Sequence, residues 1–155
     1  MPEVGERVPD FTLLDAEGRK VALAELLSRG PLILYFYPKD ETMGCTVEAC
    51  AFRDTHDEFV GVGAQVVGVS RDSPASHARF AAHHRLPFTL LSDETGEVHQ
   101  RYGIGGRLAF GDRVTLVIDR DGIVRHRFDS KLRWRAHVTT ALSGLRQVSP
   151  ASTSR

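Results

Sequence analysis

Blocks of hydrophobic and polar residues alternate along the chain, and their spacing predicts strands and helices in turn. Two short strand-like segments, 11–15 and 20–22, flank the turn sequence Ala-Glu-Gly and predict a β-hairpin. Continuous apolar runs at 31–37 and 64–70 are typical of strands buried on both faces of a sheet. A third short strand is predicted at 88–91. These elements predict a sheet with a largely apolar centre.

Helical spacing accounts for most of the remaining chain. Phe52 and Phe59 stand seven residues apart with charged residues on the other face of the same segment. Ser73 followed by Pro74 is the pattern of a cap residue with proline in the first helical turn. Helices are predicted over 24–28, 45–60, 73–84, 97–102 and 134–148.

The second half of the chain adds a glycine-rich loop and a second hairpin. The loop covers 103–111, and strands at 114–119 and 123–128 are joined by Arg-Asp-Gly, a good hairpin turn. Alternating strands and helices followed by a hairpin and a helix predict an α/β fold, with a mixed central sheet flanked by helices. The thioredoxin-like fold, carrying an N-terminal β-hairpin, is the leading candidate. We expect one domain over 1–148 and a disordered polar tail over 149–155.

Composition narrows the possible classes of protein. The 155 residues are 41% hydrophobic and 26% charged, which fits one globular domain. A net charge of zero gives no reason to expect nucleic acid or membrane partners, and no run approaches the roughly 20 apolar residues of a membrane span. The first ten residues lack the apolar stretch of a signal peptide, and two cysteines are too few for a disulfide-stapled scaffold. We therefore expect a cytoplasmic protein.

The most informative segment runs from residue 35 to residue 50. Cys45 falls where a buried strand has ended and a helix is beginning, a position with free backbone N–H groups and the positive end of the helix dipole. Both favour the thiolate, which is the nucleophilic form of cysteine. The alternative is that Cys45 is simply a small buried apolar residue.

Pro38, Thr42 and Cys45 form the pattern Pro-x-x-x-Thr-x-x-Cys. With it, the chain resembles the peroxiredoxins, and among them the bacterioferritin comigratory protein or peroxiredoxin Q group. The resemblance covers nearly the whole chain and includes Tyr-Phe-Tyr-Pro-Lys-Asp at 35–40, Gly-Cys-Thr-Val-Glu-Ala-Cys at 44–50, Val-Gly-Val-Ser at 67–70, Leu-Pro-Phe-Thr-Leu-Leu-Ser-Asp at 86–93 and Arg-Val-Thr-Leu-Val-Ile-Asp at 113–119.

The resemblance implies that Cys45 is the peroxidatic cysteine and reduces hydrogen peroxide and organic hydroperoxides. It places Thr42 and Gly44 at the substrate, where the Thr42 hydroxyl can donate to one partner and accept from another. Thr42 could instead be an ordinary helix N-cap. Pro38 would fix the loop and screen the sulfur from water, although a plain strand terminator is equally consistent with the sequence.

A cation is needed to favour the thiolate and to hold the oxyanion. The resemblance assigns this role to Arg113 at the start of a late strand, where the alternative is a surface arginine. It also matches Glu48 to a family Glu or Gln that could orient the helix start, although a solvated surface glutamate fits nearly as well.

Cys50 has the spacing of the resolving cysteine in part of the family, and would form a disulfide with the sulfenic acid left on Cys45. Residues five apart on an α-helix have Cα atoms about 8.6 Å apart. A disulfide rarely tolerates more than about 7 Å. The helix start must therefore unwind before the two cysteines bond. The alternative is that Cys50 packs in the core and another thiol resolves Cys45.

The sequence departs from the family pattern in two places. Met43 stands where the family usually has proline, and the segment 103–112 is shorter than in many relatives. Met43 should leave activity intact while altering reactivity, and the shorter segment puts the rim of the pocket in doubt.

Other functions fit the residues less well. A thioredoxin-type reductase would need Cys-x-x-Cys, and His83 and His84 with two distant cysteines lack the paired spacing of a zinc site, so we expect neither metal nor other cofactor. The alternative from another class is a redox-sensing binding protein that uses the same two-cysteine switch. The expected partners are a hydroperoxide and thioredoxin or a similar dithiol reductant, and the expected state is a monomer.

Overall fold

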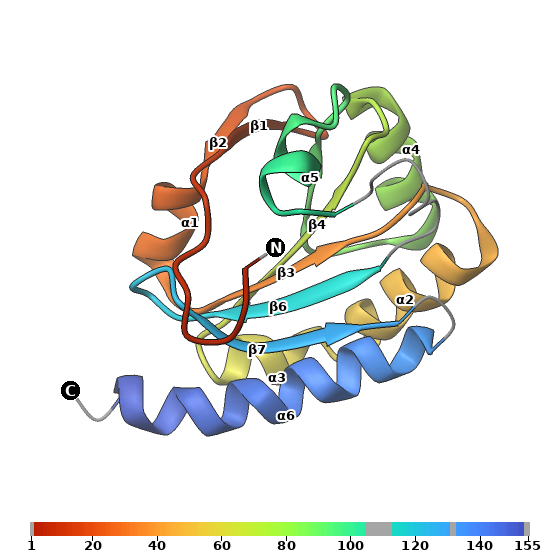
Figure 1. Cartoon of the computed structure of the whole chain (residues 1–155). Helices are drawn as coiled ribbons and strands as arrows, with labels where there is room; N and C mark the ends of the chain where they lie inside the picture. Colours follow the sequence, from red (N-terminus) through yellow and green to blue (C-terminus); the bar gives the residue numbers. More distant parts are fainter. Residues whose placement is uncertain (1, 105–112, 131–132, 154–155) are drawn as a thin grey trace.

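The computed structural model describes residues 2–104, 113–130 and 133–153. A seven-stranded mixed sheet forms its centre, in the order β2-β1-β5-β4-β3-β6-β7 (Figure 1). The strands are β1 (Thr12–Asp15), β2 (Lys20–Ala22), β3 (Leu32–Phe36), β4 (Gln65–Ser70), β5 (Thr89–Ser92), β6 (Val114–Ile118) and β7 (Val124–Asp129).

Helices cover both faces of the sheet, so that two hydrophobic cores form. The helices are α1 (Leu23–Arg29), α2 (Met43–Asp54), α3 (His56–Gly61), α4 (Pro74–His84), α5 (Glu97–Arg101) and α6 (Trp134–Thr153). One core contains buried side chains of α1 and α5. The other contains buried side chains of α2, α3, α4 and α6, and α2 also packs against α6 (Figure 1).

The central strand β3 connects the two cores. It pairs parallel to β4 and antiparallel to β6, so both of its edges are hydrogen-bonded. Successive side chains of a strand point to opposite faces. Leu34 accordingly lies in the core of α1 and α5, and Tyr35 lies in the core of α2 and α6. The loop that follows β3 therefore connects this central strand to the start of α2.

The structure confirms the α/β fold class with a mixed sheet, and it confirms both predicted hairpins. β1 pairs antiparallel with β2, and β6 pairs antiparallel with β7. Ser73 caps α4 as predicted, because its hydroxyl accepts the backbone N–H of Ser76 at 3.1 Å. No helix among the described residues is long and apolar enough to cross a bilayer.

The single helix predicted over 45–60 is wrong, because the structure divides that segment into α2 and α3 at Thr55. The Thr55 hydroxyl donates to the Ala51 carbonyl at 2.8 Å, and the Thr55 backbone N–H also reaches that carbonyl at 3.2 Å. Such back-bonding by threonine competes with the helical ladder and bends it. The periodicity of Phe52 and Phe59 continues across the break, which is why the sequence pattern does not reveal it.

The last helix is longer than predicted. We expected it to end at Val148, before Ser149 and Pro150, whereas α6 continues to Thr153. Proline costs a helix one backbone hydrogen bond and crowds the carbonyl four residues before it, and Pro150 incurs this cost only in the last turn of α6. The end of the predicted tail, 154–155, lies outside the described residues, as does most of the short segment 103–112.

Candidate active site

Cys45 lies in the first turn of α2, directly after the loop that leaves β3. Its side chain is 1% exposed and belongs to the core of α2 and α6. Pro38 is half-buried in the loop, and Thr42 is the exposed N-cap residue of α2. The Thr42 hydroxyl donates to the Lys39 carbonyl at 2.8 Å and makes no cap hydrogen bond. That hydroxyl thus occupies the cap position without serving as a cap.

Burial raises the pKa of the Cys45 thiol, and this effect outweighs the others. The Thr42 hydroxyl, the backbone at Lys39 and the Arg113 guanidinium all act to lower the same pKa. The Arg113 guanidinium thus favours the thiolate, as expected, but burial of the sulfur has the larger effect and the net direction of the pKa is upward. A water-poor environment penalises the charged sulfur more than its neighbours stabilise it.

Arg113 stands immediately before β6 and is 6% exposed, so the surface alternative is wrong. Its guanidinium lies 6.0 Å from the centre of the Trp134 ring. A Cβ atom on Gly44 would come within 2.6 Å of both Arg113 Nη2 and the Trp134 ring. Glycine at position 44 thus lets the guanidinium approach the start of α2 beside Cys45.

Glu48 is completely buried, so the solvated alternative for this residue is also wrong. Its Oε1 accepts a hydrogen bond from Arg113 Nη1 at 3.0 Å. Burial raises the pKa of Glu48 to about 8, although the Arg113 guanidinium acts to lower it. A carboxyl group with a raised pKa offsets less of the charge of Arg113, which favours the interaction of that charge with the neighbouring sulfur.

Cys50 lies on the same helix and is half-buried, and both cysteines are free thiols. Because α2 is continuous from Met43 to Asp54, the two cysteines are held on an intact helix in this state. The predicted disulfide therefore requires a change of conformation, as the helical spacing indicates.

The structure adds three residues that sequence reasoning missed. His137 of α6 places Nδ1 3.6 Å from Glu48 Oε2 and 2.7 Å from the Thr115 hydroxyl. Trp134 stacks beside Arg113. The buried Tyr35 hydroxyl has no hydrogen-bond partner among the described residues. A histidine among the apolar positions of α6 was the one available signal, since buried polar groups usually serve a partner.

The loop between β3 and α2 is anchored by Asp40, whose side chain is buried. Asp40 Oδ1 accepts from the Tyr37 hydroxyl at 2.6 Å, and Oδ2 accepts from the Ser76 hydroxyl at 2.8 Å. His77 Nδ1 also lies 2.8 Å from Oδ2. The Asp40 backbone N–H donates to Asp72 at 2.8 Å. These contacts fix the loop that carries Pro38 and Thr42 onto the first turns of α4.

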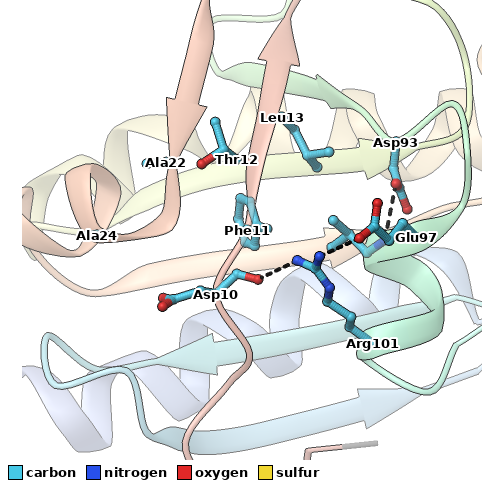
Figure 2. Close-up of a pocket in the computed structure, with 10 residues that line it drawn as sticks. Asp10, Phe11, Thr12, Leu13, Ala22, Ala24, Asp93, Glu97 and Arg101 are labelled. Atoms are coloured by element: carbon cyan, nitrogen blue, oxygen red, sulfur yellow. Dashed lines mark hydrogen bonds and ion pairs between the residues drawn. The ribbon is translucent and has the colours of Figure 1, made fainter.

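A cavity of about 510 Å³ lies on the other face of the sheet (Figure 2). Phe11, Leu13 and Val98 line it, and they belong to or pack against the core of α1 and α5. Arg101 reaches across it to the Asp10 carbonyl at 3.2 Å. Because Cys45 belongs to the opposite core, this cavity is separate from the candidate active site.

Comparisons with known proteins give a consistent picture. The model of the AhpC/TSA family matches residues 4–127. The chain is 44% identical to peroxiredoxin Q of Sedum lineare over 93% of this chain and 78% of that protein. Among solved structures, peroxidoxin BcpB of Mycobacterium tuberculosis is 41% identical with a TM-score of 0.90, covering 96% of this chain and 99% of that one. Peroxiredoxin Q of Xanthomonas campestris is 30% identical with a TM-score of 0.81, covering 90% and 91%.

Proposed function

The chain belongs to the AhpC/TSA family and is a thiol-dependent peroxidase of the peroxiredoxin Q type, and from this premise we propose that Cys45 attacks the peroxide. One observation carries the assignment. Cys45 lies in the first turn of α2, where the Thr42 hydroxyl and the Arg113 guanidinium oppose the effect of burial on its pKa, whereas Cys50 lies five residues further along α2. A nucleophile beside a fixed cation and a hydroxyl suits attack on a peroxide oxygen.

In the first step, the Cys45 sulfur forms a bond to one peroxide oxygen while the oxygen–oxygen bond breaks. The sulfur is oxidised to a sulfenic acid and the peroxide is reduced. The second oxygen leaves as hydroxide or alkoxide and takes up a proton, so that the thiol hydrogen finally resides on water or alcohol. Arg113 stabilises the charge that moves along the two oxygens, and the Thr42 hydroxyl can rotate from the Lys39 carbonyl to donate to it.

In the second step, the Cys50 thiolate attacks the Cys45 sulfur, and the sulfenic oxygen leaves as water after protonation. This step requires the first turns of α2 to unwind. Those turns contain Gly44, Thr46 and Val47, which have modest helix propensity. Their low propensity supports the proposal that the start of α2 can unwind. A dithiol reductant of the thioredoxin type then restores both thiols.

We also propose that the protein works in the cytoplasm and as a monomer. Recycling of a disulfide requires a compartment that maintains reduced dithiols. Resolution within one helix needs no residue from a second subunit. Cell fractionation and light scattering during size-exclusion chromatography test these two points, and a membrane-enclosed location or a dimer would contradict them.

Stopped-flow mixing of the reduced protein with hydrogen peroxide tests the two cysteines separately. We expect Cys45→Ser to abolish peroxide consumption. We expect Cys50→Ser to consume one equivalent and to accumulate the sulfenic acid, because nothing resolves it. Both variants should retain the wild-type circular dichroism spectrum, which shows that loss of activity is not loss of fold.

Three results would overturn the assignment. Turnover by Cys45→Ser would remove Cys45 from the chemistry. Undiminished cycling of Cys50→Ser with thioredoxin would remove Cys50 as the resolving residue. Consumption of only stoichiometric peroxide by the wild type with thioredoxin and its reductase present would favour a redox sensor over a peroxidase.

A further inference from the structure

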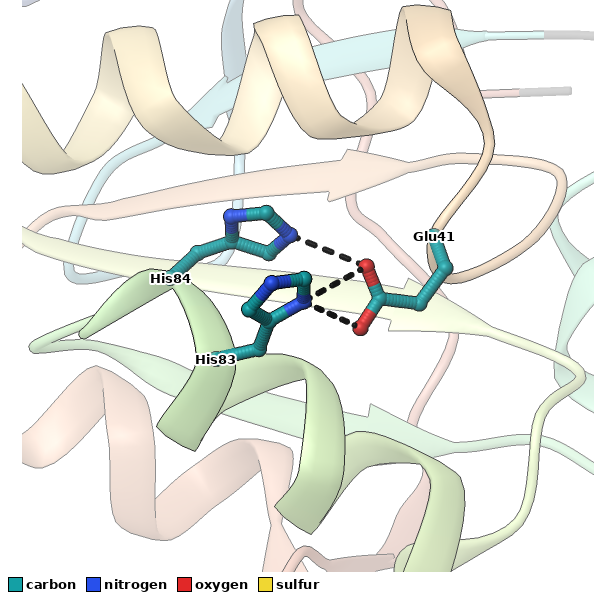
Figure 3. Close-up of side chains that lie close together, drawn as sticks. All are labelled: Glu41, His83 and His84. Atoms are coloured by element: carbon teal, nitrogen blue, oxygen red, sulfur yellow. Dashed lines mark hydrogen bonds and ion pairs between the residues drawn. The ribbon is translucent and has the colours of Figure 1, made fainter.

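Three side chains outside the proposed mechanism converge at the surface beside the active-site loop: Glu41, His83 and His84 (Figure 3). His83 Nδ1 lies 3.0 Å and 3.2 Å from the two carboxylate oxygens of Glu41, and His84 Nε2 lies 2.9 Å from one of them. The cluster therefore joins the loop before α2 to the last turn of α4, across 42 positions of sequence.

Adjacent residues on a helix point about 100° apart, so two neighbouring histidines do not ordinarily reach one point. Here His83 uses its near nitrogen, Nδ1, and His84 uses its far nitrogen, Nε2. His84 is also held in place, because its ring meets the edge of Phe80 at 5.1 Å and its carbonyl accepts from Arg53 at 2.8 Å. The position of His84 is therefore set by contacts within the protein.

The spacing of the three groups matches the needs of one small cation. Ligand atoms bound to tetrahedral zinc at about 2.0–2.1 Å stand about 3.3 Å apart. The contacts of 2.9–3.2 Å between the carboxylate and each imidazole therefore need to widen by only a few tenths of an ångström, and all three ligand atoms lie within 4.8 Å of one another. We propose that Glu41, His83 and His84 form a binding site for a divalent transition-metal ion of the zinc class.

The donor atoms define the class of ion. Two imidazoles and one carboxylate suit zinc and the neighbouring first-row metals, whereas calcium and magnesium prefer oxygen donors alone. Three protein ligands leave a fourth position for water. The side chains of His83 and Glu41 are 67% and 45% exposed, so an ion in solution can reach them. The proposed metal site lies next to Thr42 in the sequence, but binding of a metal ion there does not depend on the peroxidase reaction.

Titration of the full-length reduced protein with Zn²⁺, followed by calorimetry, tests the site, and Co²⁺ provides a visible spectrum of the bound ion. We expect one saturable ion per chain and a tetrahedral Co²⁺ spectrum without a thiolate charge-transfer band. Loss of an outer-shell partner alone costs about 10- to 100-fold in affinity. Glu41→Gln and His84→Asn should each cost at least that much.

Matched controls separate the site from ordinary surface binding. Glu94→Gln and His56→Asn make the same changes outside the cluster and should leave the affinity as in the wild type. The variant carrying both Cys45→Ser and Cys50→Ser should bind equally well. Absence of saturable binding, loss of binding in the double serine variant, or equal affinity of Glu41→Gln and Glu94→Gln would overturn the proposal.

Discussion

Asp40 and Glu41 are neighbours in the sequence, and each faces histidine from α4, but their surroundings differ completely. The Asp40 side chain is 2% exposed and faces the fully buried His77. The Glu41 side chain is 45% exposed and faces His83 and His84 at the surface. Two consecutive residues therefore place one carboxylate, that of Asp40, inside the protein and the other, that of Glu41, in contact with solvent.

The hydrogen bonds show what each pair can do. Asp40 takes donors from Tyr37, Ser76 and His77, so its oxygens are already occupied by the protein. His77 Nε2 lies 3.0 Å from the Leu91 carbonyl, so both ring nitrogens have partners within the protein. The buried pair is thus a structural tie between loop and helix. The exposed Glu41 contacts His83 and His84 through hydrogen bonds. A metal ion can take the place of the protons in those hydrogen bonds.

Breaking the buried pair should produce the largest effect. We expect His77→Ala to lower the free energy of unfolding by about 3–5 kcal/mol, because it leaves the Asp40 charge buried without its partner. Urea denaturation followed by circular dichroism measures the loss. If the free energy of unfolding fell by less than about 1 kcal/mol, the Asp40–His77 pair would contribute no more than an ion pair at the surface.

Glu48 extends the comparison to a third carboxyl group, buried like Asp40 but paired with Arg113. Its pKa in the folded protein is raised from 4.5 to about 8, so its contribution to stability is complete below pH 4.5 and is lost as the pH rises through 8. Relative to Glu48→Gln, the wild type should lose stability on the order of a few kcal/mol across this range. Urea midpoints at several pH values measure the difference, and parallel pH profiles would contradict it.

Gly44 and Gly61 make the same contrast between crowded and open positions. Gly44→Ala should displace Arg113 and Trp134, which lie 2.6 Å from the new methyl group, at a cost of about 1–3 kcal/mol. It should also slow the reaction of Cys45 with peroxide. Gly61→Ala meets nothing within 4 Å and serves as the control. Equal unfolding midpoints and peroxide rates for the two variants would show that the close approach of Arg113 and Trp134 to Gly44 affects neither stability nor reactivity.

The smallest effect is expected at the exposed carboxylate. Glu41→Gln should change the free energy of unfolding by no more than about 0.5 kcal/mol when metal is absent, because exposed ion pairs contribute little. The measurement is urea denaturation in the presence of a chelator. A loss comparable with that of His77→Ala would remove the distinction between the two carboxylates.

The sequence predicts most of the elements and directs attention to the segment around Cys45, because both depend on local patterns. The apolar run at 31–37 and the segment around Cys45 can be interpreted from neighbouring residues alone. The break at Thr55 depends on one side-chain hydrogen bond that periodicity does not record. The burial of Glu48 depends on α6 and β6 closing over it, which local pattern cannot predict.

The cluster of Glu41, His83 and His84 illustrates the same limit. Along the sequence, His83 and His84 have no third ligand nearby, so the sequence predicts no metal site there. The third donor comes from 42 residues upstream and meets them only because Asp40 fixes the loop against α4. Contacts between elements distant in sequence become visible only in the fold.

The two ends of helix α2 are held by different contacts. Its last turns are held by the fully buried Phe52 and by Arg53, which donates to the His84 carbonyl, whereas its first residue, Met43, is 76% exposed and its N-cap lacks a side-chain hydrogen bond. In the proposed mechanism the helix opens from the Cys45 end, and the time before it opens sets how long an oxidised sulfur is exposed to a second peroxide. That mechanism makes the durability of the enzyme under sustained oxidant depend on the timing of one helical turn.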